Sequence, residues 1–228
     1  MDGNPTDKII ATCVGGKLNG KGVVYLQSGN RYEGYFVDNF RHGKGVFVWA
    51  NGNRYEGDFV MGKRTGKGVW TNKDGDRYEG DYVDGKAEGH GIRTWADGNR
   101  YEGGYLKDHF SGKGVFTWAD GGHYEGDYVN GDRTGKGVWT GPIHDRYEGD
   151  FVNGRWNGNG IYTRPGGFRY EGEFVDGVPA GVGVMVWPNG DRYQGEVANG
   201  YPNGEGILTK ANGIKKKGYF TNGKYEGK

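Results

Sequence analysis

A tripeptide that recurs at a fixed interval constrains this chain more than any other feature. Tyr-Glu-Gly occurs seven times with a spacing of 23 residues, and Tyr193-Gln194-Gly195 continues the series. The seven copies begin at Tyr32, Tyr55, Tyr78, Tyr101, Tyr124, Tyr147 and Tyr170. A fixed period of this length is typical of repeat proteins, in which each repeat packs only against its neighbours. We therefore expect one uninterrupted array.

A second landmark lies in every repeat and sets the domain boundaries. If the tyrosine is position 0, Gly-x-Gly occupies positions 11–13, as in Gly66-Lys67-Gly68, and Val or Ile follows at position 14. Ile9 stands at position 0 of a weaker first copy, and Lys216-Lys217-Gly218 replaces Tyr-Glu-Gly at the other end. Degenerate end repeats are expected because each has only one neighbour. We predict a tail over 1–8, a capping repeat over 9–31, eight repeats over 32–215 and a partial repeat over 216–228.

Composition excludes several classes of protein. Among 228 residues there are 50 glycines without a triplet period, which excludes collagen, and an aromatic content of 15%, which argues against a disordered chain. The 30 basic and 29 acidic residues are interspersed, unlike the basic surface of a nucleic-acid-binding protein. Cys13 is the single cysteine, which fits a reducing compartment. With no long apolar run and no signal-peptide pattern, we expect a cytoplasmic protein, or a segment of a longer one that carries an anchor elsewhere.

Two strands are predicted in each repeat. Arg54–Val60 and Gly45–Trp49 both alternate and are rich in strand-forming residues. Asn51-Gly52 at the repeat junction suits a two-residue type I′ turn, and a loop of about five residues would join the strands within a repeat. This register pairs the tyrosine with position 16.

The predicted register also assigns the two faces of the sheet, since side chains alternate along a strand. One face would carry Tyr, the glycine at position 2, the aromatic residue at position 4, and positions 14 and 16. The glycine would leave room for a neighbouring ring. The other face would carry Arg, Glu and the variable positions 15 and 17, where Trp49, Trp95 and Trp187 would lie opposite Arg54, Arg100 and Arg192.

Two junctions depart from the pattern. Gly141-Pro142-Ile143-His144-Asp145 lacks Asn-Gly, and Arg164-Pro165-Gly166-Gly167-Phe168 alters another turn. We expect a change of twist or a protruding loop at these two places.

The combination of Tyr-x-Gly-x-aromatic, Gly-x-Gly and a turn glycine in 23 residues resembles the MORN (membrane occupation and recognition nexus) repeat over nearly the whole chain. The resemblance implies an all-β fold: an extended, twisted single-layer antiparallel sheet of stacked β-hairpins. Members of this family act mainly as scaffolds and adaptors at membrane-associated and cytoskeletal assemblies, and some arrays lie beside enzyme domains. Phosphoinositide binding has been proposed for the family.

No arrangement of residues predicts catalysis. Serine occurs only at Ser28 and Ser111, the five histidines stand at unrelated repeat positions, and no metal-ligand spacing is present. The recurring glutamates are expected to pair with the arginine row, and Gly-x-Gly lacks the following helix of a phosphate-binding loop. We therefore expect no enzyme, no cofactor and no metal.

The favoured function is a scaffold that binds a protein partner, either a helix or a peptide, along an aromatic-lined groove. Candidate partner-binding residues on the variable aromatic face are Phe47, Trp49, Trp70, Trp95, Phe116, Trp118, Trp139, Tyr162 and Trp187. A structural aromatic ladder, also a candidate for the groove, comprises Tyr32, Tyr55, Phe59, Tyr78, Tyr82, Tyr101, Tyr105, Tyr124, Tyr128, Tyr147, Phe151, Tyr170, Phe174 and Tyr193.

Three alternatives remain open. Lys215, Lys216 and Lys217, together with repeated lysines elsewhere, suggest weak binding of anionic lipid, although acidic residues are interleaved. The array could instead be a regulatory or dimerisation module of a larger enzyme. An unpaired edge strand near residues 218–222 would favour a homodimer.

Overall fold

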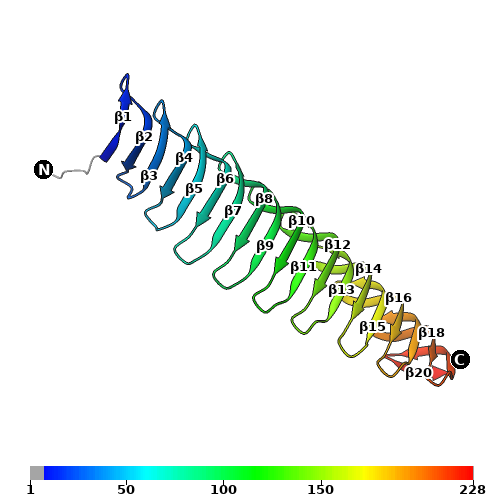
Figure 1. Ribbon diagram of the computed structural model, residues 1–228. Coiled ribbons are helices and arrows are strands. Elements are labelled where there is room, and N and C mark those ends of the chain that lie inside the picture. Colours follow the sequence, from blue (N-terminus) through cyan, green and yellow to red (C-terminus); the bar gives the residue numbers. More distant parts are fainter. Residues whose placement is uncertain (1–7, 228) are drawn as a thin grey trace. The chain divides into compact units, whose positions relative to one another are not determined.

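All the regular structure in the described part of this chain is antiparallel β-sheet. The computed structural model describes residues 8–227, so the predicted tail lies outside the described residues except for Lys8. Within residues 8–227, twenty strands form one sheet. The same residues contain no helix, and hence no helix that could cross a membrane. The chain divides into unit 1 (residues 1–111) and unit 2 (residues 112–228), and the boundary falls within β10. In each unit every strand pairs with its neighbours in sequence (Figure 1).

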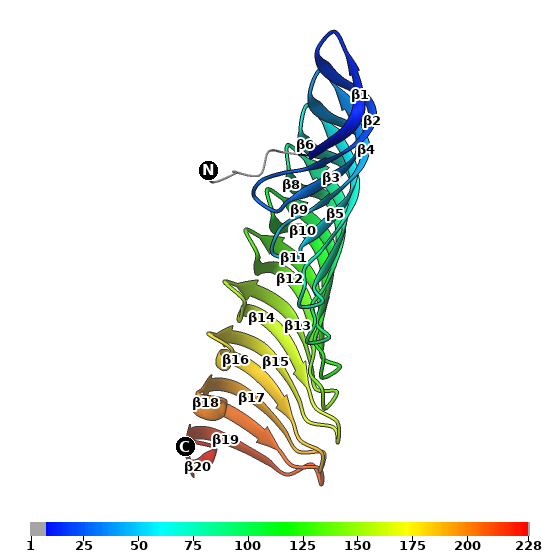
Figure 2. The same cartoon turned by 90° about the vertical axis from the view of Figure 1, so that its left-hand side faces the viewer.

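The first ten strands are β1 (Lys8–Val14), β2 (Lys17–Tyr25), β3 (Arg31–Val37), β4 (Phe40–Val48), β5 (Arg54–Val60), β6 (Lys63–Thr71), β7 (Arg77–Val83), β8 (Lys86–Thr94), β9 (Arg100–Leu106) and β10 (His109–Thr117). The last ten are β11 (His123–Val129), β12 (Asp132–Thr140), β13 (Arg146–Val152), β14 (Arg155–Thr163), β15 (Arg169–Val175), β16 (Val178–Val186), β17 (Arg192–Ala198), β18 (Tyr201–Thr209), β19 (Lys215–Thr221) and β20 (Lys224–Gly227). Seen from the side, the described strands of each unit have no second layer of secondary structure over them (Figure 2).

The turn inside each repeat is shorter than predicted. Val60 pairs with Lys63, so only Met61 and Gly62 form the loop, and their φ angles of 48° and 83° are those of a type I′ turn. The expectation of a loop of about five residues is wrong because a β-bulge follows instead. Gly57 pairs with Gly68 but Asp58 pairs with Thr65, so the second strand carries two extra residues at that point.

The turn between repeats is longer than predicted. Trp49 donates its N–H to the carbonyl of Asn53 (2.9 Å), and Gly52 donates to the carbonyl of Trp49 (2.9 Å). Gly52 has a φ of 87°, whereas Asn51 is not among the residues with positive φ. This is a three-residue loop, a type I turn followed by a left-handed glycine, and the prediction of a type I′ turn here is wrong.

These two turns shift the register by one residue and correct the predicted faces. Tyr55 pairs with Phe47 on one side and Trp70 on the other, both at position 15. A one-residue shift moves every side chain of a strand to the other face. Positions 15 and 17 therefore lie on the face of the tyrosines, which we call the Tyr face. Positions 14 and 16 lie with Arg and Glu on the opposite face, the Glu face, and the predicted contacts of Trp49, Trp95 and Trp187 with Arg54, Arg100 and Arg192 do not form.

The two irregular junctions keep the common turn. Gly141 donates to the carbonyl of Asp145 (2.8 Å) and Arg164 to that of Phe168 (2.9 Å), as Trp49 does to Asn53. His144 and Gly167 take the left-handed position, with φ of 64° and 98°. At the second junction Gly166 is also positive, with a φ of 94°, so this turn keeps the hydrogen bonds of the common turn but not all of its backbone angles. The expectation of protruding loops is wrong because neither junction adds a residue to the turn.

The end of the array also differs from expectation. β20 pairs with β19, joining Phe220 to Tyr225 and Thr221 to Lys224. The prediction that residues 218–222 form an unpaired edge is therefore wrong, because the short last strand already covers them.

The core is a ladder of rings that lie on bare backbone. Tyr55 is fully buried, and a Cβ placed on Gly68 would lie 2.5 Å from its Cε2 atom. Its Oη donates to the carbonyl of Asp58 (3.2 Å), beside the β-bulge. The ring meets Phe59 of its own repeat and Tyr82 of the next edge-to-face, with centroids 5.2 and 5.1 Å apart. Such contacts link neighbouring repeats and provide the burial that a second layer normally gives.

Candidate functional site

The Tyr face carries a second row of side chains over the buried ladder, which we call the outer row. It consists of the residues at positions 9, 15 and 17. The ring of Phe110 stacks on Tyr101 with centroids 3.7 Å apart, and Trp156 stacks on Tyr147 at 4.5 Å. Outer-row residues are mostly half-buried and differ between repeats.

Arginines at position 9 in unit 1 are enclosed by aromatic rings. The guanidinium of Arg41 lies 4.8 Å from the ring centroid of Phe47 and 5.5 Å from that of Phe59. Its Nη2 donates to the carbonyl of Gly62 (2.9 Å), in the turn of the next hairpin. Burial lowers the pKa of Arg41. Cation–π contacts and one backbone hydrogen bond thus fix the guanidinium of Arg41 on the Tyr face.

The same arrangement recurs one repeat later. The guanidinium of Arg64 lies 5.0 Å from the centroid of Tyr82 and 5.5 Å from that of Tyr55, and its Nη2 donates to the carbonyl of Gly85. In unit 2, Arg133 lies 5.5 Å from the centroid of Tyr124 and 5.6 Å from that of Trp118.

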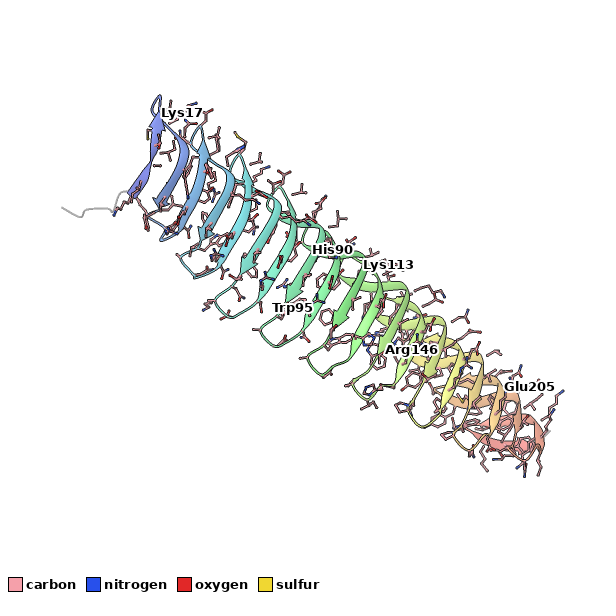
Figure 3. The ribbon with its side chains drawn as sticks, viewed as in Figure 1. Lys17, His90, Trp95, Lys113, Arg146 and Glu205 are labelled. Atoms are coloured by element: carbon pink, nitrogen blue, oxygen red, sulfur yellow. The ribbon has the colours of Figure 1, made fainter. Side chains whose placement is uncertain are left out.

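Arg93 occupies position 15, where it pairs with Tyr78 and Tyr101. Its guanidinium lies 4.8 Å from the ring centroid of Trp95, which follows the end of β8 (Figure 3). The Nε atom of Arg93 is buried and has no hydrogen-bond partner.

All nine predicted partner-binding residues lie at positions 15 and 17, and hence on the Tyr face. Phe47 and Tyr162 are buried, whereas the remaining seven are half-buried. Every residue of the predicted ladder is buried, so the ladder lies beneath the candidate surface and is not exposed on it. The two predicted sets therefore share one face.

The arginines and aromatic residues of position 9, including Arg41, Arg64, Phe110, Arg133 and Trp156, were not predicted as functional residues. Sequence reasoning placed them next to a long loop instead of on a strand. If Met61-Gly62 and its equivalents had been predicted as type I′ turns, position 9 would have been placed on a strand of the Tyr face.

Burial also changes the ionisation of the ladder. Loss of solvent raises the pKa of Tyr55 to about 12, and does the same for Tyr193. These hydroxyl groups stay protonated at neutral pH and act as hydrogen-bond donors to the backbone.

A hollow of about 530 Å³ opens on the Tyr face of unit 2. Trp156, Tyr162, Phe168, Trp187 and Tyr201 line it, with Arg164 at its exposed edge. Arg164 donates from Nε to the hydroxyl of Tyr162 (2.9 Å). The hollow offers aromatic surface together with one guanidinium.

A buried carboxylate lies behind that hollow. In other repeats an acidic side chain accepts the N–H of the residue twenty positions later, as Asp76 does from Ala96 (3.0 Å). Pro165 stands at the equivalent position after Asp145 and has no N–H to donate, and the Oδ1 atom of Asp145 is buried without a hydrogen-bond partner among the described residues. Its Oδ2 accepts the hydroxyl of Tyr162 (2.9 Å).

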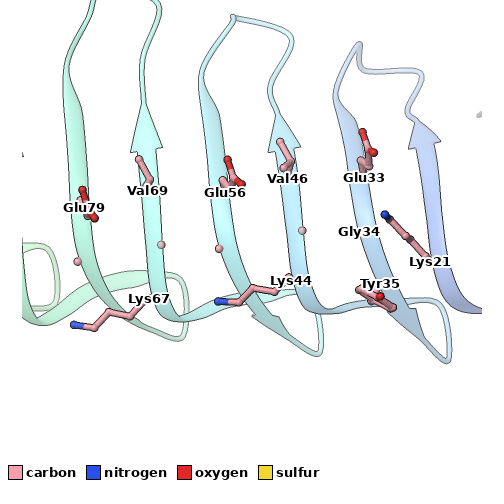
Figure 4. A pocket seen from close by; sticks show the side chains of 14 residues that line it. Lys21, Glu33, Gly34, Tyr35, Lys44, Val46, Glu56, Lys67, Val69 and Glu79 are labelled. Carbon is pink, nitrogen blue, oxygen red and sulfur yellow. The ribbon is translucent and has the colours of Figure 1, made fainter.

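The Glu face has a groove of different character. In unit 1 a groove of about 630 Å³ has glutamates and valines alternating along one side, lysines along the other, and glycines between the two sides (Figure 4). Apart from Lys21, its charged residues are paired within the sheet, as Lys44 is with Asp58 (2.8 Å) and Glu56 with Arg54 (2.5 Å). The predicted pairing of the glutamate and arginine rows is confirmed in this and other repeats.

The three consecutive lysines of β19 do not form one patch. Lys215, Lys216 and Lys217 are consecutive in β19, so alternate members point to opposite faces. Lys216 lies over the ring of Tyr225, with Nζ 5.5 Å from the centroid.

Metal ligands do not converge anywhere between Lys8 and Gly227: no group of three or more His, Cys, Asp or Glu side chains there could hold an ion. Cys13 is exposed and forms no disulfide.

Comparison with known proteins gives one clear match. The model of the MORN repeat matches nine consecutive segments that together span residues 14–215. The segments are 14–31, 32–54, 55–77, 78–100, 101–123, 124–146, 147–169, 170–192 and 193–215. No curated protein matches the chain.

Solved structures resemble the chain only distantly. The TCP10 domain of CPAP from Danio rerio, in complex with a STIL peptide, has 13% identity and a TM-score of 0.41, covering 92% of this chain and 100% of that one. The TCP domain of SAS-4 from Drosophila melanogaster, in complex with a proline-rich motif of Ana2, has 14% identity and a TM-score of 0.39, covering 78% and 85%. These TM-scores are low, and nothing about the partners of this chain follows from them.

Proposed function

Because this chain belongs to the MORN repeat family, we propose that it is a non-catalytic scaffold that binds a protein partner along its Tyr face. The observation that carries the proposal is the outer row, in which half-buried Trp, Phe and Arg side chains cover a ladder that is the same in almost every repeat. Aromatic residues and arginine are enriched where proteins bind one another. A uniform inner ladder provides the fold, and the outer row provides the differences between repeats.

The partner is a helix or an extended peptide. A single-layer sheet offers a long, shallow surface, and such surfaces are read by segments that lay a row of anchors along them. Half-buried rings such as Trp49 and Trp95 are rigid anchors, because they lose little side-chain entropy when a partner binds. We place the scaffold in the cytoplasm, at membrane-associated or cytoskeletal structures.

The test compares two faces of the same protein. The full chain, its Trp49→Ala/Trp95→Ala variant and its Glu56→Gln/Glu79→Gln variant are used to capture partners from a lysate, and the enriched protein is then purified and titrated calorimetrically. We expect the tryptophan variant to lose affinity and the glutamate variant to bind like the wild type. Equal affinity of all three proteins for the purified partner would rule out the Tyr face as the binding surface.

Direct binding of anionic lipid is the second candidate. The observation in its favour is the run Lys215-Lys216-Lys217, in which all three residues are exposed. A basic residue near an anionic surface contributes about 1 kcal/mol, and division of the lysines between two faces leaves fewer of them to act together. Co-sedimentation with vesicles that contain phosphatidylserine, at low and high salt, tests this candidate.

A further inference from the structure

We propose that the Tyr face of unit 1 binds an acidic protein segment, whose carboxylates pair with Arg41, Arg64 and Arg93. The proposal rests on the proposed function and adds to it the chemistry of the partner. It follows from a difference between the arginines of the two faces.

The three arginines of the Tyr face lack carboxylate partners. Within the described part of unit 1, no acidic side chain lies within ion-pair distance of Arg41, Arg64 or Arg93. Two of them donate to the backbone carbonyls of Gly62 and Gly85, and all three lie over aromatic rings.

The arginines of the Glu face are all paired in the same stretch of chain. Arg54, Arg77 and Arg100 each donate to the glutamate two residues later, at 2.5 Å. Their charges are therefore neutralised within the sheet. Among the arginines of β4 to β9, only those on the Tyr face lack a carboxylate partner, and charge complementarity selects an acidic occupant for that face.

Partial burial makes these cations stronger recognition elements than surface lysines would be. A guanidinium held among rings has already lost part of its hydration and its side-chain freedom, so a carboxylate that arrives meets a cation that is fixed in place. Arg93 adds a buried Nε–H that no group among the described residues accepts. A buried donor without an acceptor is costly, and a carboxylate oxygen of a partner would remove that cost.

The spacing of the arginines limits the partner. Arg41 and Arg64 occupy the same position in successive repeats, and two strand separations of ~4.8 Å place equivalent positions ~10 Å apart. An extended segment advances ~3.3 Å per residue, so acidic residues three apart would match that spacing. A helix advances ~1.5 Å per residue and would match it with acidic residues about seven apart. Apolar residues between them would meet Trp49 and Trp95.

The acidic groups near this face do not fill the role. Asp84, in the turn between β7 and β8, pairs with Lys63 (2.9 Å). Asp108, in the turn between β9 and β10, accepts the N–H of Ala87 (2.8 Å).

The experiment is a selection of binders from a phage-displayed library of random 16-residue peptides, with the full chain as target. Selected peptides are synthesised and titrated against the wild type, Arg41→Met/Arg64→Met, Arg54→Met/Arg77→Met and Trp49→Ala/Trp95→Ala. Methionine keeps an apolar stem over the rings and removes the charge. Circular dichroism verifies that each variant is folded, and Arg41→Lys/Arg64→Lys restores charge without the planar fork.

We expect peptides enriched in Asp and Glu. The Arg41→Met/Arg64→Met variant should bind them at least about tenfold more weakly, with a loss of salt dependence, while the Arg54→Met/Arg77→Met variant changes less than about twofold. The Lys variant should recover part of the affinity.

Three outcomes overturn the inference. Peptides that are weakened by the tryptophan variant but not by Arg41→Met/Arg64→Met would leave the proposed function standing and refute its acidic partner. Peptides that bind all variants alike, or a selection that enriches none, would refute both. Salt-sensitive binding to phosphatidylserine vesicles through Arg41 and Arg64, without acidic peptides, would assign these arginines to a membrane surface.

Discussion

The Tyr55 ring lies so close to Gly68 that the effect of Gly68→Ala on stability should depend on whether the ring is present. A Cβ on Gly68 would lie 2.5 Å from Cε2, 2.5 Å from Oη and 2.6 Å from Cζ of Tyr55, and these are the three nearest atoms. Overpacking of this kind costs about 1–3 kcal/mol. Gly68→Ala should therefore destabilise the protein by about that amount, because the ring cannot move away from the backbone beneath it.

Removal of the ring should reverse the effect. Tyr55→Ala costs about 3–5 kcal/mol by itself, by analogy with other aromatic truncations. In that background Gly68→Ala meets no ring, and replacing a strand glycine is worth about 0.4–1 kcal/mol through the unfolded state. We expect the double variant to be no less stable than Tyr55→Ala, which gives a coupling energy of about 1–4 kcal/mol between the two sites.

A neighbouring glycine gives the matched control. A Cβ on Gly57 would lie 2.5 Å from the Tyr55 hydroxyl, but also 2.7 Å from Cα of Gly68 and 2.7 Å from the carbonyl oxygen of Lys67. Because two of these contacts are backbone, Gly57→Ala should stay destabilising when Tyr55 is Ala. Urea unfolding followed by circular dichroism, with hydrogen exchange of β5 and β6, measures both cycles. If Gly68→Ala costs the same free energy with and without the ring, the ring is not the reason for that glycine.

Three further predictions concern hydrogen bonds and charge. Burial raises the pKa of Tyr55 and Tyr193 to about 12, above the value near 10 in the unfolded chain. The stability that these hydroxyl groups contribute is therefore complete below about pH 10 and is lost as the pH rises towards 12. Alkaline unfolding that is complete below pH 10 would contradict this. Glu56→Gln should cost less than about 1 kcal/mol, because its ion pair with Arg54 is exposed, and a larger shift of the urea midpoint would contradict this estimate. Pro165→Ala should raise the thermal midpoint of unfolding. The new N–H would satisfy Asp145 Oδ1, whose missing hydrogen bond costs about 1–3 kcal/mol, whereas loss of the rigid proline costs only about 0.4–1 kcal/mol. A lower midpoint would refute the pairing of residues 145 and 165.

Much of the architecture followed from the sequence. The period of Tyr55, Tyr78 and their equivalents predicted stacked hairpins, and the alternation of Arg54–Val60 predicted strands. Both predictions are confirmed, because a repeat that recurs without insertion can build only one local structure many times. The pairing of Arg54 with Glu56 followed from the same regularity.

The sequence did not predict which side chains share a face, and it therefore did not predict the composition of the candidate site. Asn51-Gly52 is compatible with a two-residue type I′ turn and with a three-residue turn that needs only the glycine in the left-handed region. Met61-Gly62 carries a weaker turn signal, yet it forms the two-residue turn. Arg41 and Arg64 consequently lie on a strand of the Tyr face instead of beside a loop.

The sequence by itself determined that this protein is an array of β-hairpins, since the spacing of tyrosines and glycines is a local property that each repeat carries alone. The tertiary structure decided which side chains share a face. That decision depends on how two strands pair across a β-bulge, where the Tyr55 ring covers Gly57 and Gly68 and its hydroxyl meets the Asp58 carbonyl. Side chains alternate between the two faces, so a shift of one residue in that pairing decides which side chains join the paired charges on one face and which join the aromatic rings and the arginines without carboxylate partners on the other.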